Sequence, residues 1–387
     1  MNEGFVSSMN LPDFELWERT GSRRVPLSFD LEVTPRCNFD CRHCYIRLPA
    51  GDPDARKAEL TLAEVENIAD QAVAMGALWC LITGGEPLLR EDFADLYLSL
   101  KRRGLLVSLF TNASAVTEEH VRLFRSYPPR DIEVTVYGAT PATYERVTRR
   151  PGSYAAFRRG LDLLRQGGVK VRLKAMALRS NVHELPEIAR FCRERTKDYF
   201  RFDPLLNLRY DGDEERNRDI EGERLSAEEI AAVEQSDEER ADSLARHCDT
   251  LILQRPGRQS DDHVFRCGAG THGFAVSYDG RFRLCSSLCH PGSEYDLRGG
   301  TLADAWNRFV PRVRELRSTN QEFLGKCGQC PLVNLCLWCP ANAYMETGRM
   351  DGWTQYFCDV ARSRALAIES RACATSSGAN VNRVEKD

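Results

Sequence analysis

The chain has 387 residues, of which 42% are hydrophobic and 28% are charged, and its 53 Lys and Arg residues nearly balance its 57 Asp and Glu residues. This is the composition of a globular protein of two or three domains at ~150 residues each, and a formal net charge of −4 disfavours binding to nucleic acid, which needs a basic surface. The sequence has no run of 18 apolar residues and no secretory signal, so we expect no membrane span and a cytoplasmic location.

The first half of the chain alternates strand-like and helix-like segments. Strands are expected at 27–33, 78–83, 105–110, 132–136, 169–178 and 199–202, and helices at 62–75, 92–103, 117–126, 154–165 and 184–195. Such alternation predicts a parallel sheet with helices on its outer face, which right-handed crossovers curl into an open α/β barrel. The fold class we expect is a partial (β/α)6 TIM-like barrel, with functional groups at the carboxyl ends of its strands.

The second half has a different composition. Residues 211–242 contain 14 acidic residues against four arginines, a net charge of −10, which predicts a solvated helical linker. Residues from about 255 to 360 are rich in Gly, Cys and Pro and offer little apolar core, so bound metals are expected to stabilise this small loop-rich domain. The domains we expect are an N-terminal extension (1–24), the barrel (25–208), the acidic helical linker (209–254), the small domain (255–362), and a C-terminal helix end with a disordered tail (363–387).

The 15 cysteines are distributed unevenly, with three between 37 and 44 and eight between 267 and 358. In a reducing cytoplasm, metal binding or catalysis is a better explanation of such cysteines than disulfides. Cys37, Cys41 and Cys44 form a CxxxCxxC motif directly after the first strand. Three thiolates on one short loop hold three corners of a [4Fe–4S] cube and leave one iron open. The alternatives are reduced core cysteines or a zinc site, although His43 is poorly placed as a fourth zinc ligand.

A second motif, TGGEP at 83–87, ends the second predicted strand. Gly84 and Gly85 allow a ligand to approach the backbone closely, and the Glu86 carboxylate can accept a hydrogen bond from a cationic amine. The alternative is an ordinary Gly-Gly turn before a helix. Taken together, CxxxCxxC after the first strand and GGEP after the second resemble the radical S-adenosylmethionine (SAM) superfamily over residues 25–205.

The resemblance implies how a SAM site is built. In that family three cysteines, here Cys37, Cys41 and Cys44, bind the [4Fe–4S] cluster, whose open iron is chelated by SAM, and the GGEP segment holds the SAM amine. His43, the aromatic residue before the third cysteine, would pack near adenine. Asn112 and Thr135, at strand ends, would contact ribose or carboxylate, with capping of the strand ends as the alternative. The implied chemistry is reductive cleavage of SAM to a 5′-deoxyadenosyl radical, with the electron supplied by a flavodoxin- or ferredoxin-like donor.

The second set of cysteines begins with Cys267 and Cys285, arranged as C-x12-G-x4-C. The segment between them predicts a β-hairpin with its turn at Asp279 and Gly280, which would bring both cysteines toward one metal centre. A run of further cysteines follows: Cys327, Cys330, Cys336, Cys339 and Cys358. By spacing alone, two zinc sites are a strong alternative.

This set is similar to the SPASM extension of radical SAM enzymes, over residues 265–362. SPASM domains typically bind two auxiliary [4Fe–4S] clusters, so the resemblance implies three clusters in all. By that pattern one auxiliary cluster takes Cys267, Cys285 and Cys339, and the other takes Cys327, Cys330, Cys336 and Cys358. The spacing from Cys336 to Cys339 is CxxC, one residue shorter than the CxxxC that is usual in SPASM domains. The first auxiliary cluster lacks a clear fourth ligand, and Cys289 is a fourth ligand, a hydrogen-atom donor or a core cysteine.

The function we expect is oxidation or crosslinking of a side chain in a ribosomally made peptide or protein. Sulfatase-maturing relatives carry an Asp where this sequence has Ser286, which disfavours that activity. About 25 residues precede the first strand, too few for the leader-binding domain of some relatives, so we expect a separate leader-recognition protein or direct docking. The alternatives are oxidation or rearrangement of a small metabolite such as an amino sugar, and a zinc-stabilised scaffold without redox chemistry.

Overall fold

The computed structural model describes residues 24–196, 200–253, 262–336 and 338–379. The N-terminal extension, apart from Arg24, and the last eight residues of the expected tail lie outside the described residues. No helix in the described part of the chain is long and apolar enough to cross a membrane.

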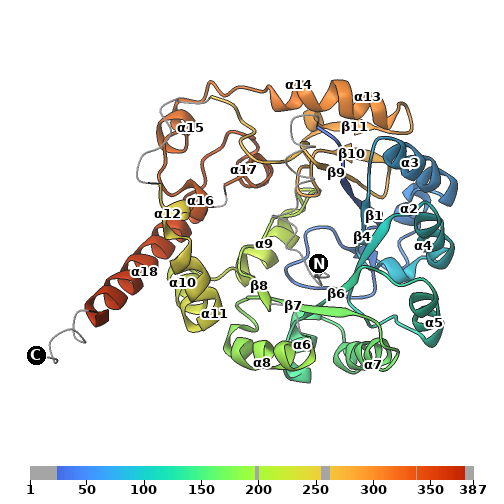
Figure 1. Cartoon of the computed structure of the whole chain (residues 1–387), viewed down its shortest axis with the longest axis horizontal. Coiled ribbons are helices and arrows are strands. Elements are labelled where there is room, and N and C mark those ends of the chain that lie inside the picture. Colours follow the sequence, from blue (N-terminus) through green and yellow to red (C-terminus); the bar gives the residue numbers. More distant parts are fainter. Residues whose placement is uncertain (1–23, 197–199, 254–261, 337, 380–387) are drawn as a thin grey trace, which may run out of the picture.

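The first half of the chain forms the expected open barrel (Figure 1). Its six parallel strands neighbour one another in chain order: β1 (Ser28–Thr34), β4 (Trp79–Gly84), β5 (Leu106–Thr111), β6 (Asp131–Val136), β7 (Val171–Met176) and β8 (Arg201–Asp203). The α/β fold class predicted from the sequence is therefore confirmed. Two very short strands, β2 (Arg36–Cys37) and β3 (Leu48–Pro49), pair in the loop after β1.

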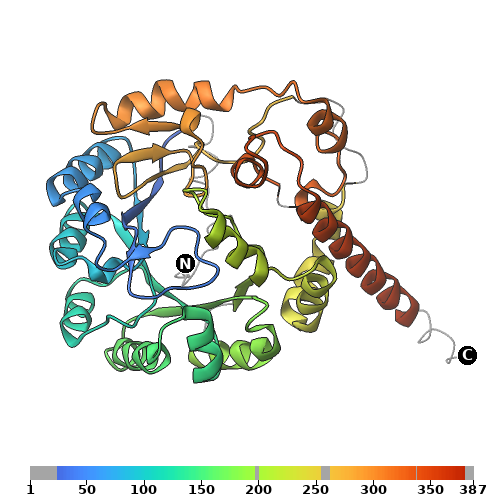
Figure 2. The ribbon, with the colours of Figure 1, turned by 180° about the vertical axis from the view of Figure 1, so that it is seen from behind.

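Helices cover the outer side of the sheet, as the view from behind also shows (Figure 2). The expected ones are α3 (Leu62–Ala74), α4 (Phe93–Arg102), α5 (Glu118–Ser126), α7 (Ser153–Gln166) and α8 (Leu185–Arg195). Additional short elements are α2 (Pro53–Ala58), η2 (Pro87–Leu89), α6 (Pro141–Thr148) and η3 (Val182–Glu184). Thr117 caps α5, because its hydroxyl accepts a hydrogen bond from the His120 N–H.

Strand β1 separates an apolar face from a polar one. Phe29, Leu31 and Val33 are at most 1% exposed and belong to the main hydrophobic core. Because side chains alternate along a strand, Asp30 and Glu32 lie on the opposite face. That face turns toward the interior of the barrel.

The C-terminal hairpin joins the barrel sheet directly. Strand β9 (Gly273–Val276) pairs in parallel with β1, and β10 (Arg281–Arg283) returns antiparallel to β9. Gly280 has a φ of +85° in the connecting turn, so the predicted hairpin is confirmed. With β11 (Glu294–Asp296), the sheet has nine strands. Main-chain pairing therefore ties the cysteine-rich region to the edge of the barrel.

The acidic segment is helical, but it is not fully solvated. It forms α9 (Glu214–Glu223), α10 (Ala227–Ser236), α11 (Glu238–Arg246) and α12 (Cys248–Leu251). Glu223 is 3% exposed and Glu234 is fully buried, where it pairs with Arg364 at 2.8 Å. The expectation of a solvated linker is wrong at these positions. Helix α10 packs against the C-terminal helix α18 (Gln355–Ala379), which buries Glu234 opposite the arginine, and Glu223 accepts a hydrogen bond from the Ser180 N–H at 2.9 Å.

The rest of the C-terminal region consists of short helices. They are η4 (Pro291–Ser293), α13 (Leu302–Asp304), the π-helical η5 (Ala305–Phe309), α14 (Val310–Arg314), α15 (Gln321–Lys326), α16 (Val333–Cys336) and α17 (Pro340–Thr347). The stretch from α13 to α14 buries Leu302, Trp306 and Val310 in the main hydrophobic core. Helix α18 then projects away from the body of the molecule (Figure 1). It reaches residue 379, within the stretch (363–387) for which a helix end and a tail were expected.

Candidate active site

A cavity of about 210 Å³ lies at the carboxyl ends of strands β4 to β7, against the loop that follows β1. It brings together eight of the nine residues that the sequence assigned to the SAM site: Cys37, Cys41, His43, Cys44, Gly84, Gly85, Asn112 and Thr135. The ninth, Glu86, does not line it. Residues from four segments of the chain thus meet at the end of the barrel where such a site was expected.

The three loop thiols lie close together, with Cys41 buried and Cys37 and Cys44 partly buried. Burial, followed by the charge of Glu86, raises the pKa of Cys37 to about 12. Burial and the neighbouring Cys44 and Cys37 raise the pKa of Cys41 well above its usual range. Cys37 Sγ accepts hydrogen bonds from the Phe39 N–H at 3.4 Å and, more weakly, from Asn112 Nδ2 at 3.8 Å. A bound cation would have to displace the thiol protons, as metals bound by cysteine do.

Gly84 and Gly85 are required by a close contact between two backbone segments. Gly84 has a φ of +137°, and a Cβ on it would lie 2.2 Å from the Thr34 carbonyl oxygen. A Cβ on Gly85 would lie 2.3 Å from the Arg36 carbonyl oxygen. The Gly85 and Glu86 N–H groups donate to those same two carbonyls at 2.7 and 2.8 Å. The GGEP segment is therefore hydrogen-bonded to the residues that lead into the first cysteine.

The Glu86 carboxylate is occupied by donors of the protein itself. It accepts hydrogen bonds from Thr111 Oγ1 at 2.7 Å, from the Asn112 N–H at 2.7 Å and from the Leu88 N–H at 3.1 Å. Burial raises its pKa to about 7. The Glu86 carboxylate, which the sequence suggests as an acceptor for a cationic amine, does not line the cavity. Glu86 instead fixes the end of β5 and, through it, Asn112.

His43 presents a neutral ring to the cavity. Burial lowers its pKa to about 4, and its Nδ1 has no hydrogen-bond partner. The ring centre lies 5.2 Å from that of Tyr137. Thr135 and Asn112 line the same cavity, and the Asn112 Oδ1 accepts from the Ser114 N–H at 2.9 Å.

Sequence reasoning missed an ion pair in this cavity. Lys174 on β7 forms an ion pair with Glu133 on β6, and its Nζ lies 4.0 Å from the centre of the Phe110 ring. The signal was present in the strand periodicity, since Glu133 is two residues from Thr135 on the same face.

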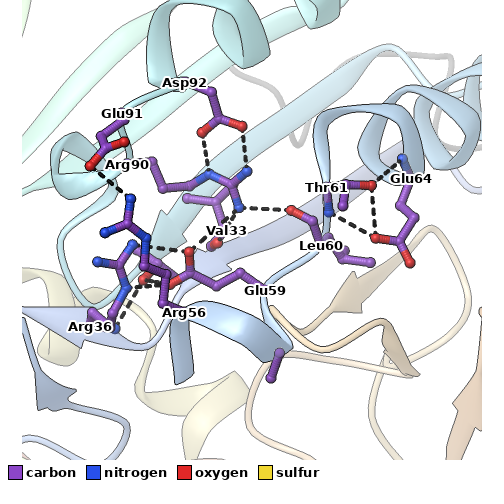
Figure 3. A network of polar contacts seen from close by, with 12 residues as sticks. Val33, Arg36, Arg56, Glu59, Leu60, Thr61, Glu64, Arg90, Glu91 and Asp92 are labelled. Carbon is purple, nitrogen blue, oxygen red and sulfur yellow. Dashed lines mark hydrogen bonds and ion pairs between the residues drawn. The ribbon is translucent and has the colours of Figure 1, made fainter. Parts of the chain in front are cut away.

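The residues that precede Cys37 belong to a buried network of charged side chains (Figure 3). Arg36 binds Glu59 through two hydrogen bonds, at 2.6 and 3.0 Å. Thr34 Oγ1 donates to the same carboxylate at 2.5 Å. Arg90, just after the GGEP segment, donates to the Val33 and Leu60 carbonyls at 3.0 and 2.9 Å and pairs with Asp92 at 2.7 Å. The cysteine loop and the GGEP segment are thus anchored to one cluster of charges.

The C-terminal cysteines gather in two groups. In the first, the neighbouring Cys339 and Cys267 add to burial in raising the pKa of Cys285 to about 11. Cys339 caps α17, because its Sγ accepts from the Asn342 N–H at 3.4 Å. Cys289 lies instead beside Arg283 and Glu294, whose charges act on its pKa.

The second group contains four thiols, and three of them, Cys330, Cys336 and Cys358, line a cavity of about 450 Å³. Cys358 and Cys330 add to burial in raising the pKa of the fourth, Cys327, to about 11. Trp353 Nε1 donates a hydrogen bond to Cys358 Sγ at 3.0 Å. A hydrogen bond from Cys336, with that from Trp353, lowers the pKa of Cys358 below its usual range.

No three His, Cys, Asp or Glu side chains in the ranges that the structure describes are placed as ligands of a single metal ion. A [4Fe–4S] cube separates its ligands, because each thiolate binds a different iron. Cysteines that line a cavity can each bind a different iron of such a cube, and the three loop cysteines line theirs.

Comparison with known proteins supports this assignment. Residues 31–192 match the family model of the radical SAM superfamily. The AdoMet-dependent heme synthase of Methanosarcina barkeri (strain Fusaro / DSM 804) is 24% identical to the chain, over 82% of the chain and 92% of that protein. The antilisterial bacteriocin subtilosin biosynthesis protein AlbA of Bacillus subtilis (strain 168) is 23% identical, over 81% and 71%.

Solved structures share the fold. Streptococcus suis SuiB bound to precursor peptide SuiA is 16% identical, with a TM-score of 0.65 over 91% of this chain and 82% of that one. Native anSMEcpe with bound AdoMet is 13% identical, with a TM-score of 0.62 over 91% and 100%. The barrel and its cysteine-lined cavity thus define a radical SAM domain. Membership of residues 31–192 in the radical SAM superfamily implies SAM and a [4Fe–4S] cluster.

Proposed function

We propose that this enzyme oxidises or crosslinks a side chain of a ribosomally made peptide or protein, and that it carries two auxiliary [4Fe–4S] clusters besides the SAM-binding one. The observation that carries the proposal is the gathering of the C-terminal thiols into two groups, of three and four, on a region joined to the barrel sheet. The domain limits we propose are those expected above, with residues 25–208 as the barrel and 255–362 as the auxiliary-cluster domain.

Cys37, Cys41 and Cys44 would hold the first cluster, and SAM would occupy the remaining part of the cavity. When bound there, SAM supplies a 5′-deoxyadenosyl radical on one-electron reduction. The chain's own part is to orient and shield. Asn112 and Thr135 would line the space for a polar ligand, where the Asn112 amide already bonds Asn38 and Ser114, and the neutral His43 offers an apolar ring face.

In the C-terminal region, Cys267, Cys285 and Cys339 would hold one auxiliary cluster, and Cys327, Cys330, Cys336 and Cys358 the other. Hydrogen bonds to cysteine sulfur tune the potential of an iron–sulfur cluster. The Asn342 N–H and the Trp353 indole supply one such bond to each group. Cys289 is a weak candidate for the fourth ligand of the first group, because the charged groups near it are Arg283 and Glu294 and not the other cysteines of that group.

The peptide substrate is supported by the names of two relatives. AlbA is a biosynthesis protein of a bacteriocin, and SuiB has been solved with a precursor peptide. We propose a substrate of the same class here, recognised by direct docking or through a separate leader-binding protein, with a flavodoxin- or ferredoxin-like electron donor.

Iron and sulfide counting tests the proposal. The protein is purified without oxygen, reconstituted, and compared with a variant carrying Cys37→Ala, Cys41→Ala and Cys44→Ala. We expect about twelve irons to fall to about eight, since each cubane holds four. Peptides encoded beside the gene are then incubated with SAM and a reductant, and mass spectrometry follows hydrogen loss. Bound zinc in place of iron would favour a scaffold protein, and unchanged iron in the variant would remove the SAM-binding cluster from this loop.

A second candidate function is chemistry on a small molecule. The heme synthase of M. barkeri matches the chain over as large a share as AlbA does. In the same assay, 5′-deoxyadenosine formation that rises with small metabolites, amino sugars and heme precursors included, and does not rise with any peptide would favour it.

A further inference from the structure

A second cavity lies beside the SAM cavity, on the polar face of β1. It measures about 190 Å³, and its lining includes Glu32, Tyr210 and Arg283. Tyr45 and Ile46, which follow the last cysteine of the loop, line both cavities. Glu32 belongs to β1 and Arg283 to β10, on either side of β9 in the sheet (Figure 1). This second cavity therefore sits between the cysteine loop of the barrel and the hairpin of the C-terminal region.

Two charged atoms at this cavity are left without a hydrogen bond. Glu32 is 3% exposed, and its Oε2 has no hydrogen-bond partner. Arg283 Nη1 is also buried without one, and it lies 3.8 Å from that oxygen, too far for a hydrogen bond. Leaving a buried charged group without hydrogen bonds is costly, so the pair is built to receive a further polar group.

The neighbouring polar groups are already engaged. Arg283 Nε donates to Glu294 at 2.7 Å, and the Tyr210 hydroxyl donates to the Ser286 carbonyl at 2.5 Å. Arg209 Nε donates to Asp211 at 2.8 Å. Among the described residues that line this cavity, Glu32 Oε2 and Arg283 Nη1 are the buried side-chain atoms without a hydrogen-bond partner.

The charged residues around the gap between Glu32 and Arg283 determine which kind of ligand can bind there. Asp30, Asp279 and Glu294 all act on Glu32 with like charge, so an anionic ligand would be repelled. A cationic ligand carries N–H donors and no acceptor, so it would leave Arg283 Nη1 without a hydrogen-bond partner. A neutral group with one N–H donor and one carbonyl acceptor meets both requirements, and an amide is such a group.

We propose that this cavity binds an amide of the substrate, whose N–H donates to Glu32 Oε2 and whose carbonyl accepts from Arg283 Nη1. The inference rests on the proposed function, because a peptide supplies such amides along its main chain and in Asn and Gln side chains. It places the substrate next to the SAM cavity, with Tyr45 and Ile46 between the two.

Three probes of the same shape and different charge test the cavity without the natural substrate. Acetamide is neutral, acetate is an anion and acetamidinium is a cation. The reconstituted holoenzyme is titrated with each under anaerobic conditions, melting temperatures are recorded, and crystals are soaked in each probe. We expect acetamide to raise the melting temperature with dose and to appear between Glu32 and Arg283, and the two ions to do neither.

Variants separate this site from general solvent effects. Glu32→Leu removes the acceptor, and we expect it to weaken acetamide binding about tenfold or more. Glu118→Leu, at an exposed glutamate of α5, is the matched control and should behave as wild type. If Glu32→Leu does not fold, Glu32→Gln keeps an acceptor but loses its charge, and a several-fold weakening is expected.

Equal responses of wild type and the Glu32 variants to acetamide would overturn the inference, and so would tighter binding of acetate or acetamidinium. The outcome is separable from the proposed function, which the iron count and the peptide assay address on the same preparation. Acetamide bound at Glu32 in a protein that modifies no peptide would keep the amide site and reject the peptide substrate.

Discussion

Both carboxylate oxygens of Glu59 accept hydrogen bonds from Arg36, which is the residue immediately before the first cysteine of the loop. The pair is buried, with 8% and 7% of the two side chains exposed. Replacing one partner of a buried ion pair leaves the other charge unpaired, which costs about 3–5 kcal/mol. The loop that would hold the SAM-binding cluster therefore depends on a glutamate 22 positions beyond its first cysteine.

We accordingly expect Glu59→Gln to destabilise the protein by about 3 kcal/mol and to lower its iron content after reconstitution. Urea unfolding and iron analysis measure the two effects. Glu91→Gln is the control, because Glu91 is 80% exposed and pairs with the exposed Arg56. Normal iron retention in Glu59→Gln would mean that the pair does not position the loop.

Gly85→Ala should also disturb the cysteine loop, because Gly85 packs against the backbone of Arg36 just before it. Its Cβ would lie 2.3 Å from the Arg36 carbonyl oxygen, so one of the two backbone segments must move. Overpacking of this kind costs about 1–3 kcal/mol. Gly51→Ala, with nothing within 4 Å of its Cβ, is the matched control. We expect Gly85→Ala alone to reduce SAM binding in equilibrium dialysis, and equal binding by both variants would contradict the close approach.

The stability of the protein should fall with rising pH because of Glu32. Burial, with the like charges of Asp30, Asp279 and Glu294, raises the pKa of Glu32 from 4.5 to about 7, against the opposing charge of Arg283. The folded state therefore binds the proton more tightly than the unfolded state between these values. The stabilisation is complete below pH 4.5 and is lost as the pH rises through 7.

Glu32→Gln removes this titration. Between pH 5 and 8 we expect the unfolding free energy of wild type to fall relative to the variant by up to ~3 kcal/mol. Asp30, whose pKa burial raises to about 6, contributes in the same direction in both proteins. Denaturant unfolding of both proteins at several pH values makes the measurement, and parallel profiles would show that Glu32 does not titrate in this range.

Trp353→Phe should shift the potential of one proposed auxiliary cluster. The indole N–H donates to Cys358 Sγ at 3.0 Å, and a hydrogen bond to a ligating sulfur favours the reduced, more negative state. Its loss should make the reduction potential more negative in an anaerobic titration followed by electron paramagnetic resonance. Trp338→Phe is the matched control, because the Trp338 N–H donates to the Gly352 carbonyl and not to sulfur. Equal potentials in the two variants would place the cluster elsewhere.

The barrel was predictable because its strands and helices are local patterns. The six strands follow from short apolar runs, and the SAM site follows from two motifs at strand ends. Glu59 was not predictable, since a single glutamate in a loop carries no periodic signal and its partner lies 23 positions earlier. The same holds for Glu234, which sits in an acidic run that composition alone assigns to solvent, although one face of α10 is buried against α18. The Glu86 carboxylate was assigned to a ligand because its protein donors, Thr111 and Asn112, come from another strand.

The parallel pairing of β1 with β9 also constrains how the chain reaches its folded state. Ser28 pairs with Gly273, so one edge of β1 has no partner until the ribosome has made about two thirds of the protein. Pairings this distant in sequence close slowly, and an open strand edge is a site of aggregation in the meantime. A fragment that stops after the radical SAM barrel would keep that edge exposed permanently. The C-terminal region therefore also has a role during biosynthesis, because its strand β9 covers the open edge of the barrel sheet.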